Sequence, residues 1–196
     1  MLSGIILSAG ESRRMKGIIK ALLKINNTTF IEHIIDLMLN SPIDELIVVL
    51  GANYEKILKV INNYPIKVVI NHNWQEGQLS SLRMGIINLS PQSEGIIFTP
   101  VDHPLVLQST YNRLCNEWKK DKTRIVLPSY HMRKGHPAIF PASLYNEILC
   151  KNFEHGARDI LELRRDIIHY VIIEDEGTVR DIDTLEDYNT LIKEDS

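Results

Sequence analysis

The stretch that decides the fold is Ile5-Ile6-Leu7-Ser8-Ala9-Gly10-Glu11-Ser12-Arg13-Arg14-Met15. It opens with a short apolar run of the kind that buried parallel strands show, because helices cover both faces of such a strand. Small and basic residues follow at once. Small residues let the backbone approach a phosphate chain, and their amide groups can point at its oxygens. The stretch therefore predicts a buried strand, Ile5–Ser8, with an anion-binding loop at its carboxyl end.

Similar apolar runs recur along the chain, and amphipathic stretches separate them. The runs lie at residues 46–50, 68–70, 96–98, 125–127 and 170–173. Thr29 followed by Glu32 is a capping box that opens a helix reaching about Asn40. Further helices are expected at residues 54–62, 80–89, 109–119, 142–150, 157–163 and 185–193. The alternation predicts a single α/β domain over residues 1–196, with three layers, a mostly parallel central sheet and a Rossmann-like arrangement.

The composition is that of an ordinary globular chain. It has 196 residues, 22 Lys+Arg, 25 Asp+Glu, a net charge of −3, 44% apolar residues and two cysteines. These values exclude a disordered or fibrous chain and a disulfide scaffold. The start has no positively charged leader, and no apolar run reaches the roughly 20 residues of a membrane span. We expect a cytoplasmic protein with no membrane or nucleic-acid partner.

Basic residues concentrate in the loop after the first strand. Residues 12–31 hold five cations and no carboxylate. Arg14 can bind an anion through a bidentate fork, and Lys20 can bind it as a point charge. The loop matches neither a Walker sequence nor the dinucleotide fingerprint, since no Gly-Lys-Ser/Thr follows and Gly10 starts no G-x-G-x-x-G. A basic surface turn is the alternative interpretation.

A second candidate segment, residues 71–85, follows the third strand. Its Gly, Ser and Asn residues offer close backbone approach and neutral hydrogen bonds ahead of a helix. This pattern suits a nucleobase, or an anion at a helix N-terminus. A plain loop with a Ser N-cap is the alternative.

Carboxylates follow the fourth strand and precede the last helix. Asp102 lies between two prolines just past a buried strand, which suits a magnesium ligand because hard cations take carboxylate oxygen. Asp181 or Asp183 is the candidate second ligand. The alternatives are a turn cap for Asp102 and a helix N-cap for Asp183, with Glu186 three residues later.

Other kinds of site find no matching pattern. The seven histidines lack a zinc spacing, and neither Cys115 nor Cys150 has a neighbouring histidine or a C-x-x-C context. No G-x-S-x-G occurs, so a serine hydrolase is not expected. Gly135-His136-Pro137 and Gly156-Ala157-Arg158 are weaker candidate segments.

Taken together, these segments resemble the MobA-like nucleotidyltransferases, and within that group the molybdenum cofactor cytidylyltransferase family. Residues 7–15 resemble the L-A-A-G-x-S-x-R-M signature, with Lys20 at the position of the family's lysine. Residues 71–85 resemble N-x-x-W-x-x-G-x-x-S-S-L-x-x-G, and residues 101–104 contain the D-x-P motif. The segments 135–137, 156–158 and 181–188 follow in the family order, so the resemblance runs from residue 7 to about residue 191.

The resemblance implies a nucleotidyltransferase fold and activity. A phosphate of the acceptor attacks the α-phosphorus of a nucleoside triphosphate, and pyrophosphate leaves. Arg14, Lys20 and Asp102 are the implied catalytic residues. The implied nucleotide contacts are Leu7, Ser8, Ala9, Gly10, Ser12, Arg14, Lys20, Asn71, Gly77, Ser80 and Ser81.

The resemblance also implies where the other ligands bind. Asp102 and Asp183 are the implied Mg²⁺ ligands, with Asp181 as the alternative to Asp183. His136 and Arg158 are the implied acceptor contacts. The nucleotide-binding part then covers about residues 1–105 and the acceptor-binding part about residues 106–196.

The pair Ala9-Gly10 resembles the CTP-using members, whereas G-G resembles the GTP-using ones. The resemblance therefore implies transfer of CMP from CTP to molybdopterin or its molybdenum form, with a molybdoenzyme or chaperone as a further partner. Alternatives are GTP as donor, or a sugar, alditol or terpenoid phosphate as acceptor. A nucleotide-sugar glycosyltransferase and a non-catalytic cofactor chaperone or regulator are alternatives of other classes.

Three residues depart from the family pattern. Ser8 replaces a usual Ala, and Lys16 stands where a Gly is usual, with Gly17 next to it. His103 fills a position that Gln or Met often holds. The resemblance therefore leaves open the backbone path at Lys16 and the group that His103 faces.

Overall fold

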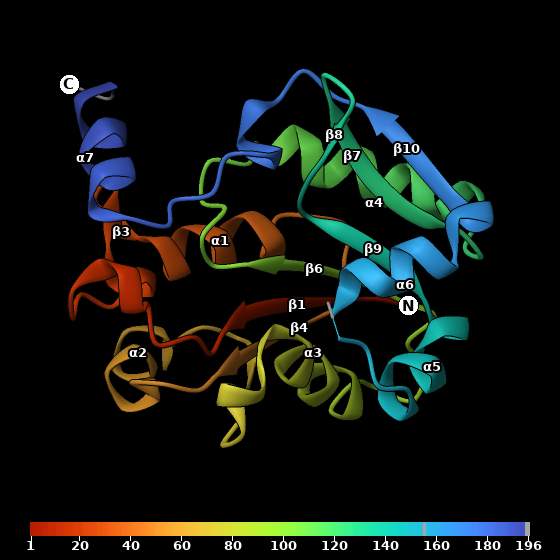
Figure 1. Ribbon diagram of the computed structural model, residues 1–196, viewed down its shortest axis with the longest axis horizontal. Coiled ribbons are helices and arrows are strands. Elements are labelled where there is room, and N and C mark those ends of the chain that lie inside the picture. The colour runs from red at the N-terminus through yellow and green to blue at the C-terminus, as the bar shows by residue number, and fades with distance from the viewer. Residues whose placement is uncertain (155, 195–196) are drawn as a thin grey trace.

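The computed structural model describes residues 1–154 and 156–194. Its centre is a sheet with the strand order β10-β7-β9-β6-β1-β4-β5, and β8 lies beside β7 (Figure 1). The strands are β1 (Leu2–Ser8), β4 (Glu45–Leu50), β5 (Lys67–Ile70), β6 (Gly95–Pro100), β7 (Ile125–Tyr130), β8 (Arg133–Lys134), β9 (Ala138–Pro141) and β10 (Ile168–Ile172). A separate hairpin joins β2 (Lys24–Ile25) and β3 (Thr28–Thr29). The prediction of a mostly parallel sheet is confirmed, since β8 and β9 alone among the described strands of this sheet run antiparallel to their neighbours.

Helices cover both faces of the sheet and give the three layers that the sequence predicts (Figure 1). They are α1 (Phe30–Leu39), α2 (Tyr54–Ile61), α3 (Gln78–Ile87), α4 (Gln108–Lys120), α5 (Tyr145–Cys150), α6 (Ala157–Leu163) and α7 (Leu185–Glu194). Side chains of α1, α2 and α4 belong to one buried cluster, and those of α3, α5 and α6 belong to the other. Within the described parts of the chain, no helix has the length and apolarity needed to cross a membrane.

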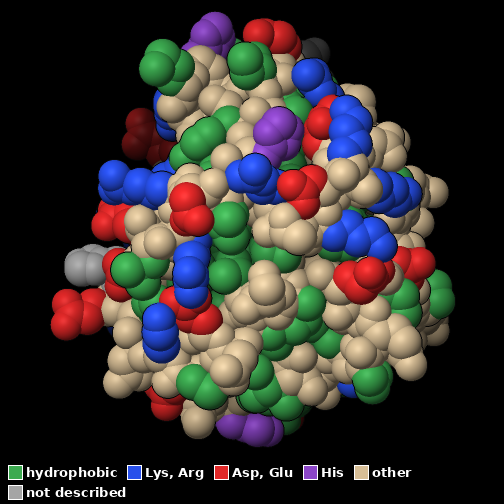
Figure 2. All heavy atoms as spheres, turned by 90° about the vertical axis from the view of Figure 1, so that its right-hand side faces the viewer, with side chains coloured by type: hydrophobic (Ala, Val, Ile, Leu, Met, Phe, Trp, Pro, Cys, Tyr) green, Lys and Arg blue, Asp and Glu red, His purple; other side chains and the backbone are tan. Residues whose placement is uncertain are grey.

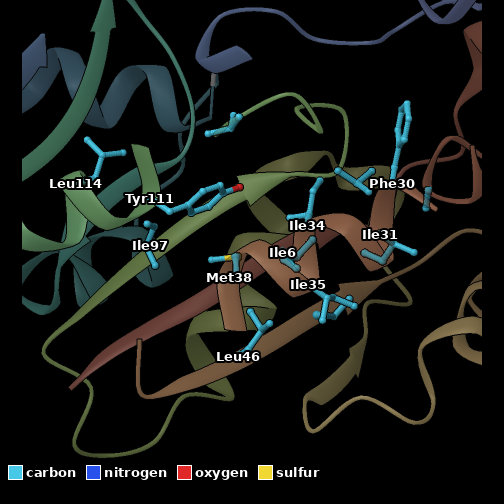
Figure 3. Close-up of a cluster of buried hydrophobic side chains, with 14 of the residues drawn as sticks. Ile6, Phe30, Ile31, Ile34, Ile35, Met38, Leu46, Ile97, Tyr111 and Leu114 are labelled. Atoms are coloured by element: carbon cyan, nitrogen blue, oxygen red, sulfur yellow. The ribbon is translucent and has the colours of Figure 1, made fainter. Parts of the chain in front are cut away.

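The central strands are apolar on both sides because both sides are buried. In β1, Ile6 belongs to the cluster under α1 and α4, whereas Ile5 belongs to the cluster under α3. Figure 3 shows the first cluster, where Ile34 and Met38 of α1 lie near Ile6. None of these four side chains is exposed. Truncating one of them to Ala is expected to cost about 2–5 kcal/mol of stability.

The structure departs from the predicted elements mainly in the second half of the sheet. The sequence predicts no strand at β9, a four-residue segment that ends in Pro141 and is held in the sheet by pairing with β6 and β7. The helix predicted over residues 142–150 begins as a 3-10 turn, Ala142–Leu144, before α5. Other ends differ by up to three residues, since backbone pairing extends the strands beyond their apolar cores.

The central strands β1 and β6 run parallel, so their amino ends lie at one edge of the sheet and their carboxyl ends lie at the opposite edge. β1 and β6 are neighbours in register, with Leu7 beside Pro100. Figure 2 views the molecule from the side of their amino ends, where Lys and Arg side chains alternate with Asp and Glu. At the other edge, the segments that follow Leu7 and Pro100 begin side by side. These segments carry the predicted anion-binding loop and the predicted metal ligand Asp102.

Candidate active site

The loop after β1 is closed by Ser12. Its hydroxyl accepts a hydrogen bond from the backbone N–H of Lys20 at 3.2 Å, and the intervening Arg13–Met15 segment forms a 3-10 turn. Ser12, Lys16 and Gly17 have φ angles of 56°, 51° and 89°. A left-handed backbone costs a residue other than glycine about 1–2 kcal/mol. Lys16 therefore makes the turn itself, together with Gly17, at the position where the family usually has Gly.

Two acidic and two basic side chains meet where the loops after β1 and β6 approach the segment before α7. Nζ of Lys20 lies 3.2 Å from Oδ2 of Asp102 and 2.6 Å from Oδ1 of Asp183. A guanidinium nitrogen of Arg14 lies 2.6 Å from Oδ2 of Asp183. We call these four residues the charged cluster. The side chain of Lys20 is 10% exposed and that of Arg14 is 71% exposed, so Lys20 is a fixed internal cation and Arg14 closes the cluster from the solvent side.

Asp102 stays ionised in this surrounding. Burial by itself raises its pKa, but the hydrogen bond with His103 and the charge of Lys20 outweigh burial and lower the pKa to about 2. Nδ1 of His103 lies 3.0 Å from Oδ1 of Asp102, and Lys20 is near the other carboxylate oxygen. Both oxygens of Asp102 are therefore partnered, and the carboxylate carries a full negative charge at neutral pH.

The segment before α7 brings Asp183, rather than Asp181, to the charged cluster. The backbone N–H of Ile182 donates to the carbonyl of Asp102 at 2.8 Å and ties this segment to the loop after β6. Asp181 lies outside the cluster and lines a second, larger cavity. Of the two candidate second metal ligands, Asp183 is therefore the one beside Asp102.

The helix cap of α7 also differs from the alternative drawn from the sequence. A cap formed by Asp183 with Glu186 is wrong, because Thr184 and Asp187 form it instead. Oδ2 of Asp187 accepts from the backbone N–H of Thr184 at 2.7 Å, and Oγ1 of Thr184 accepts from the backbone N–H of Asp187 at 3.2 Å. Asp183 needs no cap role, and its carboxylate is available to Lys20 and Arg14.

A cavity of about 340 Å³ lies beside the charged cluster. Its lining includes most of the predicted nucleotide contacts, namely Leu7, Ser8, Ala9, Gly10, Ser12, Lys20, Gly77 and Ser81, together with Asp102. Trp74, Gln75 and Gln78 line it as well. The sequence does not single out these three, although the tryptophan of the 71–85 pattern was an available signal. Gly77 has a φ of 96°, so this wall of the cavity depends on a glycine.

Asn71 and Ser80 lie behind the wall of this cavity. The Nδ2 of Asn71 donates to the hydroxyls of Ser80 at 2.9 Å and Ser81 at 3.0 Å, and its Oδ1 accepts from the backbone N–H of Asn73. Ser80 in turn donates to the carbonyl of Gly77 at 2.8 Å. These bonds hold the loop in shape. Direct nucleotide contact by Asn71 and Ser80 stays a prediction, whereas Ser81 lines the cavity.

A second cavity, of about 640 Å³, adjoins the first, and both are lined by Leu7, Gly77 and Gln78. The predicted acceptor contacts His136 and Arg158 both line it. Apolar side chains form much of its wall, among them Leu79, Leu82, Phe98, Leu127, Phe153 and Leu161. Arg133 and Lys134 of β8 add cations that the sequence does not single out, although they directly precede Gly135-His136-Pro137. This cavity can take an apolar body that carries an anionic group.

His136 is a neutral side chain in this cavity. Burial lowers its pKa, and the adjacent His103 lowers it further, to about 3. Its buried Nδ1 has no hydrogen-bond partner within the described chain. Its backbone N–H donates to the carbonyl of Thr178 at 2.8 Å, so its main chain is fixed although its Nδ1 forms no hydrogen bond within the described chain.

The donor set of the charged cluster fits a hard divalent cation. Asp102 and Asp183 both contact the same ammonium group, so their carboxylates converge on one point. Mg²⁺ is usually held by one or two carboxylates together with substrate phosphates and waters. The described residues contain no group of three or more His, Cys, Asp or Glu that would cage a metal without such help. Two carboxylates beside an anion-binding loop suit a magnesium ion that arrives with a triphosphate.

Comparison with known proteins identifies a family and two full-length relatives. The family described as MobA-like NTP transferase domain matches residues 4–169. Nicotine blue oxidoreductase of Paenarthrobacter nicotinovorans is 29% identical over 199 residues, covering 97% of this chain and 96% of that protein. Molybdenum cofactor guanylyltransferase of Haemophilus influenzae (strain KW20 / Rd) is 27% identical over 189 residues, covering 95% of each chain.

Solved structures of Rv0371c from Mycobacterium tuberculosis H37Rv share the fold. One has a TM-score of 0.86 at 26% identity and covers 98% of this chain and 97% of its own. A second, a complex with manganese, has a TM-score of 0.81 at 22% identity and covers 98% of both chains. The whole of the sheet and its covering helices therefore has a counterpart in an experimental structure.

Proposed function

Because this chain belongs to the family of MobA-like NTP transferase domains, we propose that it transfers a nucleotidyl group from a nucleoside triphosphate to a phosphorylated acceptor. The observation that carries the proposal is the charged cluster. Lys20 contacts both Asp102 and Asp183 at the carboxyl ends of β1 and β6, next to two adjoining cavities. One cavity then holds the nucleotide and the other holds the acceptor, as expected for a reaction that joins two ligands.

The reaction demands positioning and charge neutralisation rather than a covalent enzyme intermediate. An oxygen of the acceptor phosphate forms a bond to the α-phosphorus, the bond to the β-phosphate oxygen breaks, and its electron pair leaves with pyrophosphate. Lys20 supplies a nearly buried positive charge beside the smaller cavity. Arg14, whose side chain is exposed, exchanges Asp183 for a phosphate oxygen and neutralises the leaving pyrophosphate.

Asp102 and Asp183 are the residues that would hold Mg²⁺. When bound, the ion supplies charge neutralisation and fixes the orientation of the phosphate oxygens. Without it, Lys20 balances the two carboxylates, so the cluster stays neutralised before the nucleotide arrives. The two carboxylates therefore form a cation-binding site that exists before the nucleotide binds.

We assign CTP as the donor. Ala9 supports this choice because the pair Ala9-Gly10, which lines the smaller cavity, resembles the pair in the CTP-using members of the family. A side chain at Gly51 would collide with the carbonyl oxygen and the Cβ of Ala9, so the backbone at Ala9 is packed closely against Gly51 and cannot shift towards it. GTP is the alternative, and the relative from Haemophilus influenzae that is named a guanylyltransferase supports it.

For the acceptor we assign a phosphomonoester of the molybdopterin type. The larger cavity offers apolar walls to a ring system, and Arg133, Lys134 and Arg158 offer cations to its anionic groups. These three cations lie after about residue 105, whereas Leu79, Leu82 and Phe98 of the apolar wall lie before it, so the division of the chain into two binding parts stays a prediction. A sugar or alditol phosphate is the alternative acceptor, since Glu76, Gln78 and Asp181 also line this cavity and can form hydrogen bonds with hydroxyl groups.

The test is a pyrophosphate-release assay with CTP, GTP, ATP and UTP, each with molybdopterin and with or without Mg²⁺. Magnesium-dependent release that needs both CTP and molybdopterin supports the proposal. The variant Ala9→Gly is expected to move the preference several-fold from CTP towards GTP, because it introduces the Gly-Gly pair that resembles the GTP-using members of the family. A preference for GTP in the wild type would change the donor, and no release with any triphosphate would refute nucleotidyl transfer to this acceptor.

A second candidate function is favoured by one comparison. The relative from Paenarthrobacter nicotinovorans is named an oxidoreductase and matches nearly the full length of this chain. In that case the two adjoining cavities would hold a nicotinamide dinucleotide and a reducible organic substrate. Titration with NADPH and NADH in the same binding panel discriminates the two functions. Tight binding of a reduced dinucleotide without pyrophosphate chemistry would favour the redox function.

A further inference from the structure

His103 lies at the boundary between the two cavities. Asp102 lines the smaller cavity, and the next residue, His103, lines the larger one. The short loop after β6 is therefore a partition with a carboxylate towards the nucleotide side and an imidazole towards the acceptor side. The reacting atoms of a transfer between the two ligands must meet near this partition.

The imidazole of His103 is held rigidly. Its Nδ1 lies 3.0 Å from Oδ1 of Asp102, and its ring meets the ring of His136 edge to face at 4.9 Å between centroids. His136 in turn meets Phe98, which packs on Phe140 at 5.0 Å. The side chain of His103 is 12% exposed. The carboxylate of Asp102 and the edge-to-face packing of the neighbouring rings thus fix the orientation of the His103 ring.

One nitrogen of this fixed ring has no partner. A carboxylate only accepts hydrogen bonds, so Nδ1 of His103 carries the proton between the two groups. Nε2 makes no hydrogen bond to any described residue and is not among the buried unpartnered atoms. It is the ring nitrogen of His103 left for a ligand in the larger cavity, which His103 lines.

We propose that His103 is a positioning residue for the acceptor, and that its Nε2 forms a hydrogen bond with the acceptor's phosphate at the partition. This proposal rests on the proposed function, since it names the group that holds the attacking phosphate. The hydrogen bond holds the phosphate at the partition while another of its oxygens forms a bond to the α-phosphorus and pyrophosphate leaves with the electron pair of the broken bond.

Asp102 then acts on both ligands of the reaction. One oxygen faces Lys20 in the charged cluster, and the other orients His103. A single carboxylate therefore links the position of the acceptor phosphate to the position of the nucleotide phosphates. Such a link keeps the attacking oxygen and the α-phosphorus in one fixed relation, which is where the rate advantage of bringing two reactants together arises.

Two substitutions separate positioning from packing. His103→Gln and His103→Met both introduce residues that the family often has at this position, so both are expected to fold. Gln keeps a hydrogen-bonding group near the place of Nε2, and Met fills the same space without one. The matched control is His169→Gln on the edge strand β10, since His169 lines neither cavity.

The first measurement is binding of phenyl phosphate, an aromatic phosphomonoester, by calorimetry. We expect His103→Met to weaken binding about tenfold, the effect of one lost hydrogen bond to a charged group, while His103→Gln and His169→Gln stay within about threefold of the wild type. Equal affinity of the Met and Gln variants would overturn the proposal. So would the absence of wild-type binding at millimolar concentrations of phenyl phosphate.

The second measurement is turnover with the nucleotide and molybdopterin. His103→Met should raise KM for the acceptor about tenfold and leave KM for the nucleotide within twofold, because Nε2 faces only the acceptor side. Equal changes in both values would indicate a structural role and overturn the proposal. If the wild type binds phenyl phosphate through His103 but releases no pyrophosphate, the proposed function fails while the positioning site stands.

Discussion

The two ends of the central sheet carry ion pairs of similar length in opposite surroundings. At the amino end, Nζ of Lys122 lies 2.8 Å from Glu94, and the two side chains are 47% and 49% exposed. At the carboxyl end, Nζ of Lys20 lies 2.6 Å from Asp183, and the two side chains are 10% and 22% exposed. Figure 2 shows the amino end as a surface of interspersed opposite charges. Distance alone therefore does not distinguish a solubilising pair from a functional one.

Burial makes the difference because it removes the water that would otherwise solvate each charge. An exposed pair exchanges contacts with water for a contact with its partner, and the net gain is small. A buried pair depends on its partner, since a charge left alone there is costly. At the carboxyl end, the buried charges are therefore paired with one another until a charged ligand takes the place of one partner.

The largest expected effect is at Asp102. Asp102→Asn keeps the size of the side chain but removes the charge that faces Lys20 and the proposed metal. We expect the rate of pyrophosphate release to fall about 100- to 1,000-fold, as when one electrostatic contact to a transition state is lost. Glu186→Gln is the matched control, because Glu186 is exposed in the first turn of the same helix and lines neither cavity. Equal losses in both variants would contradict the choice of metal ligands.

The next effect concerns stability and the metal together. Lys20→Met keeps an apolar stem but leaves Asp102 and Asp183 without their shared cation. We expect the free energy of unfolding to fall by about 2 kcal/mol, less than for a fully buried pair because Arg14 and His103 still partner the two carboxylates. Added Mg²⁺ should then raise Tm more in this variant than in the wild type, since Lys20 no longer competes for the site. An unchanged response to Mg²⁺ would contradict convergence of the two carboxylates on a metal position.

A third effect is the acid sensitivity of the acceptor side. Burial and the neighbouring His103 lower the pKa of His136 from 6.5 to about 3. Between these values the unfolded chain binds a proton that the folded chain does not, so this stability contribution is complete above pH 6.5 and is lost as the pH falls towards 3. One such group changes the free energy of unfolding by about 1.4 kcal/mol per pH unit.

The variant His136→Gln should flatten that dependence. Denaturant titrations between about pH 6 and about pH 4 are expected to show a smaller slope in the variant than in the wild type. His72→Gln, a change at an exposed histidine after β5, should keep the wild-type slope. A wild-type slope in His136→Gln would mean that other groups cause the acid sensitivity.

The fold was largely predictable because its central strands are buried on both sides. Ile5, Ile6 and Leu7 fill both faces of β1, so the local sequence alone indicates a parallel strand. The antiparallel β9 could not be found in this way. Its residues are apolar, but its place depends on pairing with β6 and β7, which are distant in sequence.

Site residues could be predicted from the sequence where a motif and a position after a strand end are enough to indicate the role of the residue. Lys20, Asp102 and Asp183 follow from motif and position, and the structure brings them into contact. Asn71 and Thr184 show what a motif cannot tell. Whether a polar side chain faces a cavity or closes its own loop depends on a few ångströms of tertiary geometry, and here both use their hydrogen bonds locally.

The smallest expected effect tests the amino end itself. Glu94→Gln removes the partner of Lys122 at the exposed pair and leaves the hydrogen-bonding shape in place. Because solvent takes over the lost contact, we expect Tm to stay within experimental error and pyrophosphate release to be unchanged. The hydrogen bonds to Lys122 and to the N-terminal ammonium lower the pKa of this carboxyl, but its side chain is 49% exposed, so water can solvate these groups when the bonds are lost. A measurable loss of stability from Glu94→Gln, next to the loss from Lys20→Met, would show that burial is not what separates the two ends.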